Sequence, residues 1–363
     1  MLENDVRSVR VRLGWSQEEL ASRSGVSRAG ISAIETGRLV PSTAAALALA
    51  SAMGTTVESL FRLPGSQPSP GEPAWAWPPP FTPWRYWRAE VAGRASLYPV
   101  EDSPIGLVPH DGTAGPSGCE PGPRSDPART LVLACCDPAV GLLAAELARQ
   151  EDVRLIVLPR SSGAALELLE RGLVHAAGIH LARDDRPEGN AAAILARSAA
   201  GSTTAQHRWQ LLRIAGWDEG IALAPGLALG SIRDVLAARL RWVVREPGSG
   251  ARQCLDELLE SPRRPRTPRS WPVAFDHRGV AGAIKGRGAD AGICLRLAGE
   301  EAGLHFLSVR HEAYDLCLAD DPRDAPLLRA LIRVVRSEPY RRLLADLPGY
   351  DTARTGELQP VGS

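Results

Sequence analysis

Residues 245–252 are Arg245-Glu246-Pro247-Gly248-Ser249-Gly250-Ala251-Arg252, a turn of mostly small residues between two apolar patterns. The run 240–244 before it predicts a strand, and the run 253–259 after it predicts a helix. Two glycines flank the serine, so the backbone there can approach a ligand closely. The helix points free N–H groups and its positive dipole end at the turn, which predicts an anion-binding site. The alternative is an ordinary turn that requires glycine; no Gly-Lys-Ser/Thr follows, so this is not a P-loop.

The overall composition is that of a soluble globular protein. The 363 residues are enough for two or three domains, and 44% of them are hydrophobic and 23% charged. Acidic and basic residues are balanced at 42 each, so any contact with nucleic acid must come from a local patch.

The sequence predicts a cytoplasmic protein without a membrane span. The N-terminus is acidic, no apolar signal segment follows it, and no run of about 18 apolar residues occurs. Cysteine spacings match no zinc pattern, so we expect reduced thiols, no metal and no cofactor. The adjacent pair Cys135-Cys136 leaves a redox role open.

Residues 1–63 predict an all-α domain of four or five short helices. Ser16 and Glu19 form a capping box, and Gly25 and Gly37 end the second and third helices. Two short helices joined by a glycine-containing turn make a helix-turn-helix. The helices are expected at 6–13, 17–24, 27–36 and 43–53.

This segment resembles the phage-repressor-like (XRE) helix-turn-helix family. The resemblance is carried by Arg10, Ser16-Gln17-Glu18-Glu19-Leu20-Ala21, Gly25-Val26-Ser27, Ile31-Ser32-Ala33-Ile34-Glu35-Thr36-Gly37-Arg38 and Pro41-Ser42. It implies that the third helix enters the major groove of double-stranded operator DNA. The residues it places at the DNA are Gln17, Ser27, Arg28, Ala29, Gly30, Ser32 and Arg38.

The resemblance also implies separate roles for these side chains. Gln17 and Arg38 are expected at phosphates, and Arg28 is the candidate to read guanine. Arg10 and Glu35 look like the family's structural ion pair, the alternative being a solvated pair worth little. Residues 1–63, called the head from here on, carry seven Arg and six acidic residues. The head is therefore nearly neutral, and a single copy should bind DNA weakly. We expect a homodimer that binds two half-sites. A helix-turn-helix used only for protein contacts is the alternative.

Residues 64–128 predict a Pro/Trp-rich linker with short strands. Residues 63–71 have the composition of a flexible linker, and strands are expected at 87–91 and 96–100. The aromatic residues could form a lid on the next domain or a partner site. The stretch 111–128 lacks periodicity and predicts a surface loop or disorder. The tryptophans are Trp75, Trp77, Trp84 and Trp87.

Residues 129–363 alternate strands and helices. The first three strands and the helices between them form a βαβαβ run, which predicts parallel strands with ligands at their carboxyl ends. The whole segment predicts two α/β lobes that share a crossing point. Strands are expected at 130–134, 153–158, 174–179, 208–214, 220–224, 241–244, 289–293, 304–309 and 314–319. Helices are expected at 138–149, 164–171, 232–238, 253–259, 279–285, 327–335 and 339–344.

This segment resembles the type II periplasmic-binding-protein fold, and within it the substrate-binding domains similar to molybdate-binding proteins. The carrying motifs are Cys135-Cys136-Asp137-Pro138, Ser161-Ser162-Gly163, Ala177-Gly178-Ile179-His180-Leu181, Glu219-Gly220-Ile221-Ala222-Leu223-Ala224, residues 245–252, Asp276-His277 and Ala289-Asp290-Ala291-Gly292. The chain departs from the family at Cys135-Cys136, where Ser or Gly-Ser-His is usual, and at Val244, where Asn is frequent.

The resemblance implies a small anionic effector: molybdate, tungstate or a molybdenum-cofactor-related compound. Asp137 would repel an anion unless it contacts another group, His180 could equally be a core histidine, and Glu312 and Asp315 are expected on lobe-crossing strands away from the ligand. The candidate ligand-binding residues are Cys136, Asp137, Ser161, Ser162 and His180 from the first lobe, and Ser249, Gly250, Arg252 and His277 from the second.

The function predicted is a ligand-responsive one-component transcriptional regulator, not an enzyme. Two alternatives remain open. One is an enzyme acting on a small anionic metabolite, with Cys136 as nucleophile and His180 or His277 as base. The other is a C-terminal domain that only dimerises.

Overall fold

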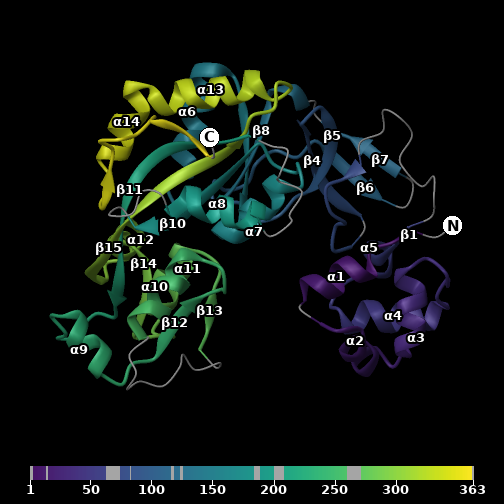
Figure 1. The fold of residues 1–363 in the computed structure, drawn as a ribbon. Coiled ribbons are helices and arrows are strands. Elements are labelled where there is room, and N and C mark those ends of the chain that lie inside the picture. The colour runs from purple at the N-terminus through teal and green to yellow at the C-terminus, as the bar shows by residue number, and fades with distance from the viewer. Residues whose placement is uncertain are drawn as a thin grey trace. The chain divides into compact units, whose positions relative to one another are not determined.

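The computed structural model describes residues 3–13, 15–62, 74–81, 83–115, 118–122, 126–183, 189–199, 208–259 and 271–361. The chain divides into two compact units, Met1–Glu72 and Pro73–Ser363 (Figure 1). The boundary falls inside the predicted linker segment; residues 63–73 themselves lie outside the described ranges. Within these ranges, no helix combines the length and the apolar character that a bilayer crossing requires.

The first unit is the predicted helical domain. Ser16, Ser27 and Ser42 each accept a backbone N–H at a helix start, so the sequence signals for the helix boundaries are confirmed to within about one residue. A two-stranded sheet of β1 and β2 joins the ends of the domain and was not predicted. The elements are β1 (Glu3–Asn4), α1 (Val6–Arg12), α2 (Gln17–Ser24), α3 (Arg28–Glu35), α4 (Thr43–Ala52), α5 (Val57–Leu60) and β2 (Phe61–Arg62).

A five-stranded sheet begins the second unit. The predicted hairpin is present as β4 and β5, but the loop expected over 111–128 is wrong, because β6 and β7 pair there. Glycine is needed at Gly112, where a side chain would collide with Tyr86 and with the backbone of β7. That glycine-rich strand lacks the alternating pattern by which strands are identified. The strands are β3 (Ala74–Trp75), β4 (Trp84–Val91), β5 (Arg94–Pro99), β6 (Gly112–Gly115) and β7 (Gly118–Pro121).

Two α/β lobes make up the rest of this unit, as predicted. In the first lobe, β8 pairs in parallel with both β9 and β10, which confirms the βαβαβ run. Helices α8 and α12 were not predicted. The first lobe holds η1 (Pro127–Arg129), β8 (Thr130–Cys135), α6 (Val140–Glu151), β9 (Arg154–Pro159), α7 (Ser162–Glu170), β10 (Ala176–Arg183), α8 (Gly189–Ala199), α13 (Ala325–Arg336), α14 (Glu338–Ala345), β16 (Tyr350–Asp351) and β17 (Leu358–Val361). The second holds α9 (Ile232–Ala237), β12 (Trp242–Arg245), α10 (Gly250–Leu259), β13 (Val273–Ala274), α11 (His277–Lys285), β14 (Ala291–Leu295) and α12 (Arg296–Glu301).

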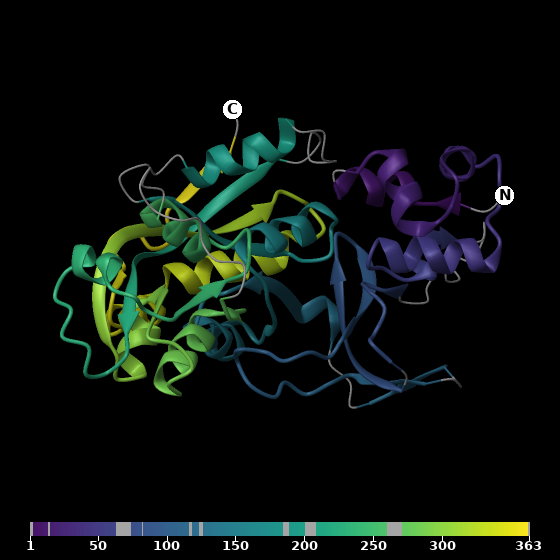
Figure 2. The same cartoon turned by 90° about the horizontal axis from the view of Figure 1, so that it is seen from below.

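Two long strands, β11 (Trp209–Leu223) and β15 (His305–Ala319), run through both lobes (Figure 1). They pair antiparallel along their whole length and lie side by side in both views (Figure 2). The strands predicted at 208–214 and 220–224 are one strand, as are those predicted at 304–309 and 314–319, so the predicted division is wrong. The apolar pattern breaks at Asp218-Glu219 and at His311-Glu312, yet these residues continue the strands, and three of the four side chains are buried. The strand order β13-β12-β14-β11-β15-β10-β8-β9 makes one sheet shared by both lobes.

Candidate functional site

The carboxyl ends of strands from both lobes meet at one place. Cys136 and Asp137 follow β8, and His180 lies near the end of β10. From the second lobe, Gly250 begins α10 and His277 begins α11. A Cβ atom on Gly250 would lie only 2.5 Å from His180 Nδ1, and the rings of His180 and His277 are 5.6 Å apart. The structure therefore brings these five predicted residues together between the lobes.

His180 is the centre of a buried chain of polar contacts. Its Nε2 lies 3.3 Å from Cys136 Sγ, and its Nδ1 lies 2.7 Å from a carboxylate oxygen of Glu312. Burial opposes the charged form of the imidazole, but Cys136 and Glu219 outweigh it and raise the pKa of His180. The ring is thus fixed by an acid on one side and a thiol on the other, so His180 is not an isolated core histidine.

Two carboxylates of this site, Glu219 and Glu312, are not among the predicted ligand-binding residues. Glu219 and Glu312 come from the two crossing strands, and both pair with Arg310. Burial raises the pKa of Glu219 to about 8 and that of Glu312 to about 7. Glu312 does lie on a crossing strand as predicted, but it contacts a candidate ligand residue. The sequence gives no signal that Glu312 belongs to the site, other than its place in a strand. Glu219 and Glu312 are far apart in the chain, so their proximity appears only in the folded sheet.

Two basic side chains of the second lobe, His277 and Arg245, have buried nitrogen atoms without partners among the described residues. His277 is fully buried, and neither ring nitrogen has a hydrogen-bond partner among the residues that the structure describes. Burial and the nearby Arg245 lower the pKa of His277, so the imidazole is neutral. Arg245 pairs through Nε with Glu246 at 2.9 Å, but its buried NH1 has no partner in the part of the chain that the structure describes. Arg245 belongs to the turn of residues 245–252, but it is not among the predicted ligand-binding residues.

Asp137 is held by the protein itself. Its Oδ1 accepts hydrogen bonds from the Tyr350 hydroxyl at 2.7 Å and from the Ala139 N–H at 2.9 Å. Burial raises the pKa of Asp137 to about 6, because the two donors only partly replace water. These contacts give Asp137 a structural role beside the site.

A cavity of about 160 Å³ opens beside these residues. Both lobes line it, and residues 102–104 of the preceding segment close one side. Trp75 and Trp77 pack against Tyr86 and Tyr98 of their own sheet, so these tryptophans do not fill the cavity. The lining residues are Asp102, Ser103, Pro104, Cys135, Cys136, Asp137, Pro138, Pro159, Asp276, His277 and Arg278.

Of the predicted serines and Arg252, Ser162 contacts the site, whereas Ser249 and Arg252 lie beside it at another pocket. Ser162 Oγ accepts the His180 N–H at 3.2 Å, and Ser161 precedes it at the start of α7. Ser249 donates to the Glu246 carbonyl at 2.9 Å, and Arg252 pairs with Asp256 at 3.0 Å. Ser249 and Arg252 line a separate, more open pocket of about 480 Å³.

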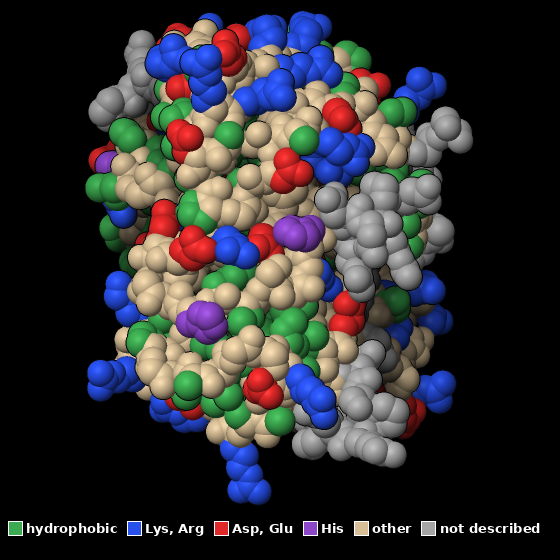
Figure 3. Space-filling model, turned by 90° about the vertical axis from the view of Figure 1, so that its left-hand side faces the viewer, with side chains coloured by type: hydrophobic (Ala, Val, Ile, Leu, Met, Phe, Trp, Pro, Cys, Tyr) green, Lys and Arg blue, Asp and Glu red, His purple; other side chains and the backbone are tan. Residues whose placement is uncertain are grey.

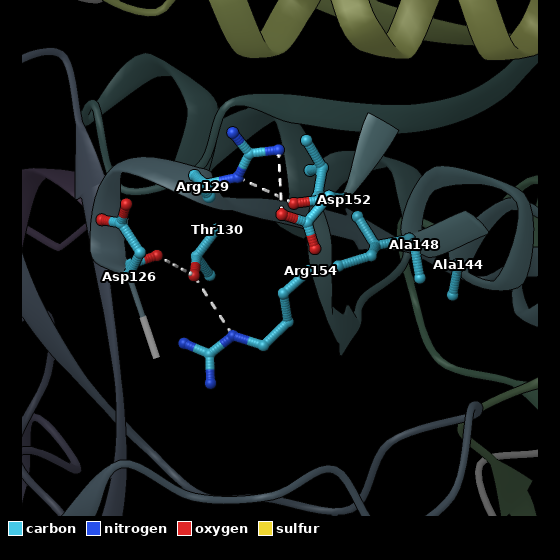
Figure 4. A pocket seen from close by; sticks show the side chains of 9 residues that line it. Asp126, Arg129, Thr130, Ala144, Ala148, Asp152 and Arg154 are labelled. Atoms are coloured by element: carbon cyan, nitrogen blue, oxygen red, sulfur yellow. Dashed lines mark hydrogen bonds and ion pairs between the residues drawn. The ribbon is translucent and has the colours of Figure 1, made fainter. Parts of the chain in front are cut away.

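Another pocket, of about 440 Å³, lies at the amino ends of β8 and β9 (Figure 4). Both arginines of this pocket form ion pairs within the protein: Arg129 pairs with Asp152 at 3.2 Å, and Arg154 pairs with Asp111 at 2.7 Å. The charges on the face shown in Figure 3 offer no better candidate. On the face in Figure 3, basic side chains gather toward the top but are interspersed with acidic ones. The site between the lobes therefore remains the candidate.

In the first unit, the predicted DNA-contacting residues lie at the start of α2 and along α3. Arg28 is exposed and lies 3.5 Å from Glu18. Ser27 caps α3 by accepting the Gly30 N–H at 3.1 Å, and Arg38 donates to Thr36 at 3.0 Å. Ala29 is exposed and Ser32 half-buried on the same helix.

The predicted ion pair of the head is present. Arg10 Nε lies 2.6 Å from Glu35, and both side chains are largely buried. Gln17 donates to the same carboxylate at 2.8 Å, so one of its amide hydrogens is held within the protein.

Comparisons with known proteins agree with both units. A PBP superfamily domain matches residues 144–336, and a helix-turn-helix domain matches residues 6–60. The Bacillus subtilis (strain 168) uncharacterized HTH-type transcriptional regulator YgzD is 40% identical over 62 residues, which are 17% of this chain and 94% of YgzD. The uncharacterized protein YvgK of the same organism is 31% identical over 128 residues; these are 35% of this chain and only 41% of YvgK.

Two solved structures from transport systems resemble part of this chain. An ABC-type phosphate transport receptor from Vibrio cholerae has 13% identity and a TM-score of 0.43, covering 61% of this chain and 99% of the receptor. The tungstate ABC transporter structure from Geobacter sulfurreducens has 16% identity and a TM-score of 0.44, covering 60% and 98%.

The chain belongs to the PBP superfamily and carries a helix-turn-helix of the regulator type at its N-terminal end. A DNA-binding domain fused to a substrate-binding domain is the organisation of a ligand-responsive transcription regulator.

Proposed function

We propose that closure of the two lobes over a small molecule controls the binding of operator DNA. Residues 1–63 bind the DNA, residues 129–363 bind the effector, and residues 64–128 connect them. The cavity bounded by both lobes carries this proposal, because a ligand shared between lobes favours the closed arrangement. Only a ligand with different affinities for the open and closed states can change DNA binding. The place of action is the cytoplasm, where the DNA is.

The effector is proposed to be a small anion. Arg245 supports this, since a buried guanidinium nitrogen without a partner is costly unless an anion accepts its hydrogen bond. Helices α7 and α11 begin at the site and add N–H groups and their dipoles. Molybdate, tungstate and molybdenum-cofactor-related compounds are the first candidates.

Thermal melting with a panel of oxyanions tests this assignment. Molybdate, tungstate, sulfate, phosphate and molybdenum-cofactor precursors are each added to the full chain. An effector at 100 times its dissociation constant should stabilise the fold by about 2.7 kcal/mol. The shift should disappear in Arg245→Met and persist in Arg329→Met, an exposed arginine on α13. If no anion raises the melting temperature, the effector class is wrong.

A DNA experiment tests the regulator itself. Operator sequences are recovered by in vitro selection with the full chain, and affinity is measured by fluorescence anisotropy with and without the effector. We expect the effector to change the affinity at least several-fold. An effector that binds without changing DNA affinity would contradict coupling between the two units.

One observation favours a second function, thiol chemistry on a small metabolite. Cys136, His180 and Glu312 are ordered as a nucleophile, a base and an orienting acid. Alkylation of Cys136 across a range of pH tests this, in a Cys119→Ser background because Cys119 is exposed. Reaction well below the usual thiol pKa would support a catalytic thiolate, and an ordinary profile would exclude it.

A further inference from the structure

We propose that Cys136, His180 and His277 form a binding site for a divalent transition-metal ion, best matched by Zn²⁺. One ligand atom from each of these buried residues lies within 4.8 Å of the other two. A thiol and two imidazoles are ligands that zinc prefers. The sequence shows no zinc spacing because the three residues come from distant parts of the chain: Cys136 follows β8, His180 lies in β10, and His277 begins α11 in the other lobe.

The distances suit a tetrahedral ion. Zinc bonds of about 2.3 Å to sulfur and 2.0–2.1 Å to nitrogen put neighbouring ligand atoms roughly 3.3–3.6 Å apart. Cys136 Sγ and His180 Nε2 are already 3.3 Å apart. Only a small movement of His277 is then needed to complete three bonds.

His277 is the independent observation that points to a ligand. Its side chain is fully buried between the lobes, and within the described ranges neither ring nitrogen has a hydrogen-bond partner. Buried polar groups without partners are rare because they lose their bonds to water. The thiol–histidine pair described above does not explain this residue, whereas a metal ion would use one of its nitrogens.

Glu312 completes the arrangement expected around a metal-bound histidine. Its carboxylate lies 2.7 Å from His180 Nδ1, on the side of the ring away from Cys136. Such a carboxylate fixes the ring and makes its other nitrogen a better ligand. Glu312 is in turn paired with Arg310. We therefore assign Glu312 as a positioning residue.

A second group, His180 with Glu219 and Glu312, also lies within reach of one ion. Arg310 already pairs with both carboxylates, so a cation there would compete with a buried guanidinium. At the site with Cys136, Arg245 lies nearby, but among the described residues it pairs with Glu246 and with none of the three ligand groups. This site also adjoins the cavity of about 160 Å³, which leaves the fourth position open to water or an anion.

The two lobes would share the ion, since Cys136 and His180 come from one and His277 from the other. An ion bound by all three would hold the lobes closed. That such closure alters DNA binding rests on the proposed function, whereas the metal site does not.

The test is titration of the metal-free full chain with Zn²⁺ and Co²⁺. We expect one equivalent of Co²⁺ to bind with a thiolate-to-metal charge-transfer band and tetrahedral visible bands, and Zn²⁺ to displace it. Cys136→Ser should abolish the charge-transfer band, and His277→Gln should lower the affinity at least tenfold. Glu312→Gln should weaken binding by about 10–100-fold while keeping the band.

Exposed residues provide the controls. His305→Gln and Cys119→Ser should bind both ions as the parent does. Circular dichroism checks that each variant is folded. A parent that binds neither ion, or variants at Cys136 and His277 that bind as tightly as the parent, would overturn the site. Stoichiometric metal binding with unchanged DNA affinity would leave the site intact and contradict only the regulatory coupling.

Discussion

Single side chains determine how the helix-turn-helix holds together. Arg10, Gln17 and Glu35 join α1, α2 and α3 through one carboxylate. Burial opposes ionisation of Glu35, but hydrogen bonds from Arg10 and Gln17 outweigh it, so the pKa of Glu35 lies below its ordinary value. The ion pair is therefore part of the core, and the alternative of a solvated pair does not apply to it.

Loss of Arg10 should destabilise the head. Arg10→Met leaves the buried carboxylate without its charged donor, which should cost about 2 kcal/mol at neutral pH. Because the folded pKa of Glu35 is lowered, the stabilisation is complete above the ordinary pKa of about 4.5 and is lost as the pH falls through the lower folded value. Hydrogen exchange of the α1–α3 amides in the full chain measures this.

Arg23→Met is the matched control, because the Arg23–Glu19 pair is exposed and should contribute little. Equal protection of the α1–α3 amides in Arg10→Met and Arg23→Met would contradict a structural role for the buried pair.

Arg28 and Arg38 should affect DNA binding in different ways. Arg28→Ala should cost about 1–3 kcal/mol and relax the preference at one base pair, since base contacts carry specificity. Arg38→Ala should weaken all sequences equally and reduce the slope of log affinity against log salt by about one. Binding measured on a panel of operator variants at several salt concentrations separates the two. Identical effects of both substitutions would contradict these roles.

At the scale of elements, the contact between α10 and β10 sets how closely the lobes approach. Gly250→Ala would place a methyl group 2.5 Å from His180 and act as a wedge. We expect a folded protein that no longer becomes more compact when the effector is added. Small-angle scattering with and without the effector measures this. Gly282→Ala, on the open side of α11, is the control. A Gly250→Ala variant that closes normally would show that the lobes do not meet there.

Element boundaries in the head followed from the sequence because serine caps and glycine stops act locally. The crossing strands did not, since buried Asp218, Glu219 and Glu312 interrupt their apolar pattern and find partners only in the folded sheet. For the same reason the site was only partly predictable. Cys136 and His277 were identified by position at strand ends, but Glu312 and Arg245 acquire their roles from neighbours distant in the chain.

At the scale of the whole molecule, the nearly neutral head should make DNA binding depend on two copies. Operator DNA with two half-sites should bind at least about tenfold more tightly than a single half-site, because two heads then act together. Light scattering of the free protein at micromolar concentration measures the dimer directly. A monomer with equal affinity for both DNAs would contradict the homodimer.

The two crossing strands also have a consequence for synthesis of the chain. The second lobe is one continuous segment that runs from the end of β11 to the start of β15, whereas the core of the first lobe draws on residues from Leu131 to Tyr350. On the ribosome, the second lobe is complete once the start of β15 has emerged and paired with the end of β11. The first lobe begins earlier but waits for β15 to pair with β11. The lobe that is started first is therefore the one that is finished last.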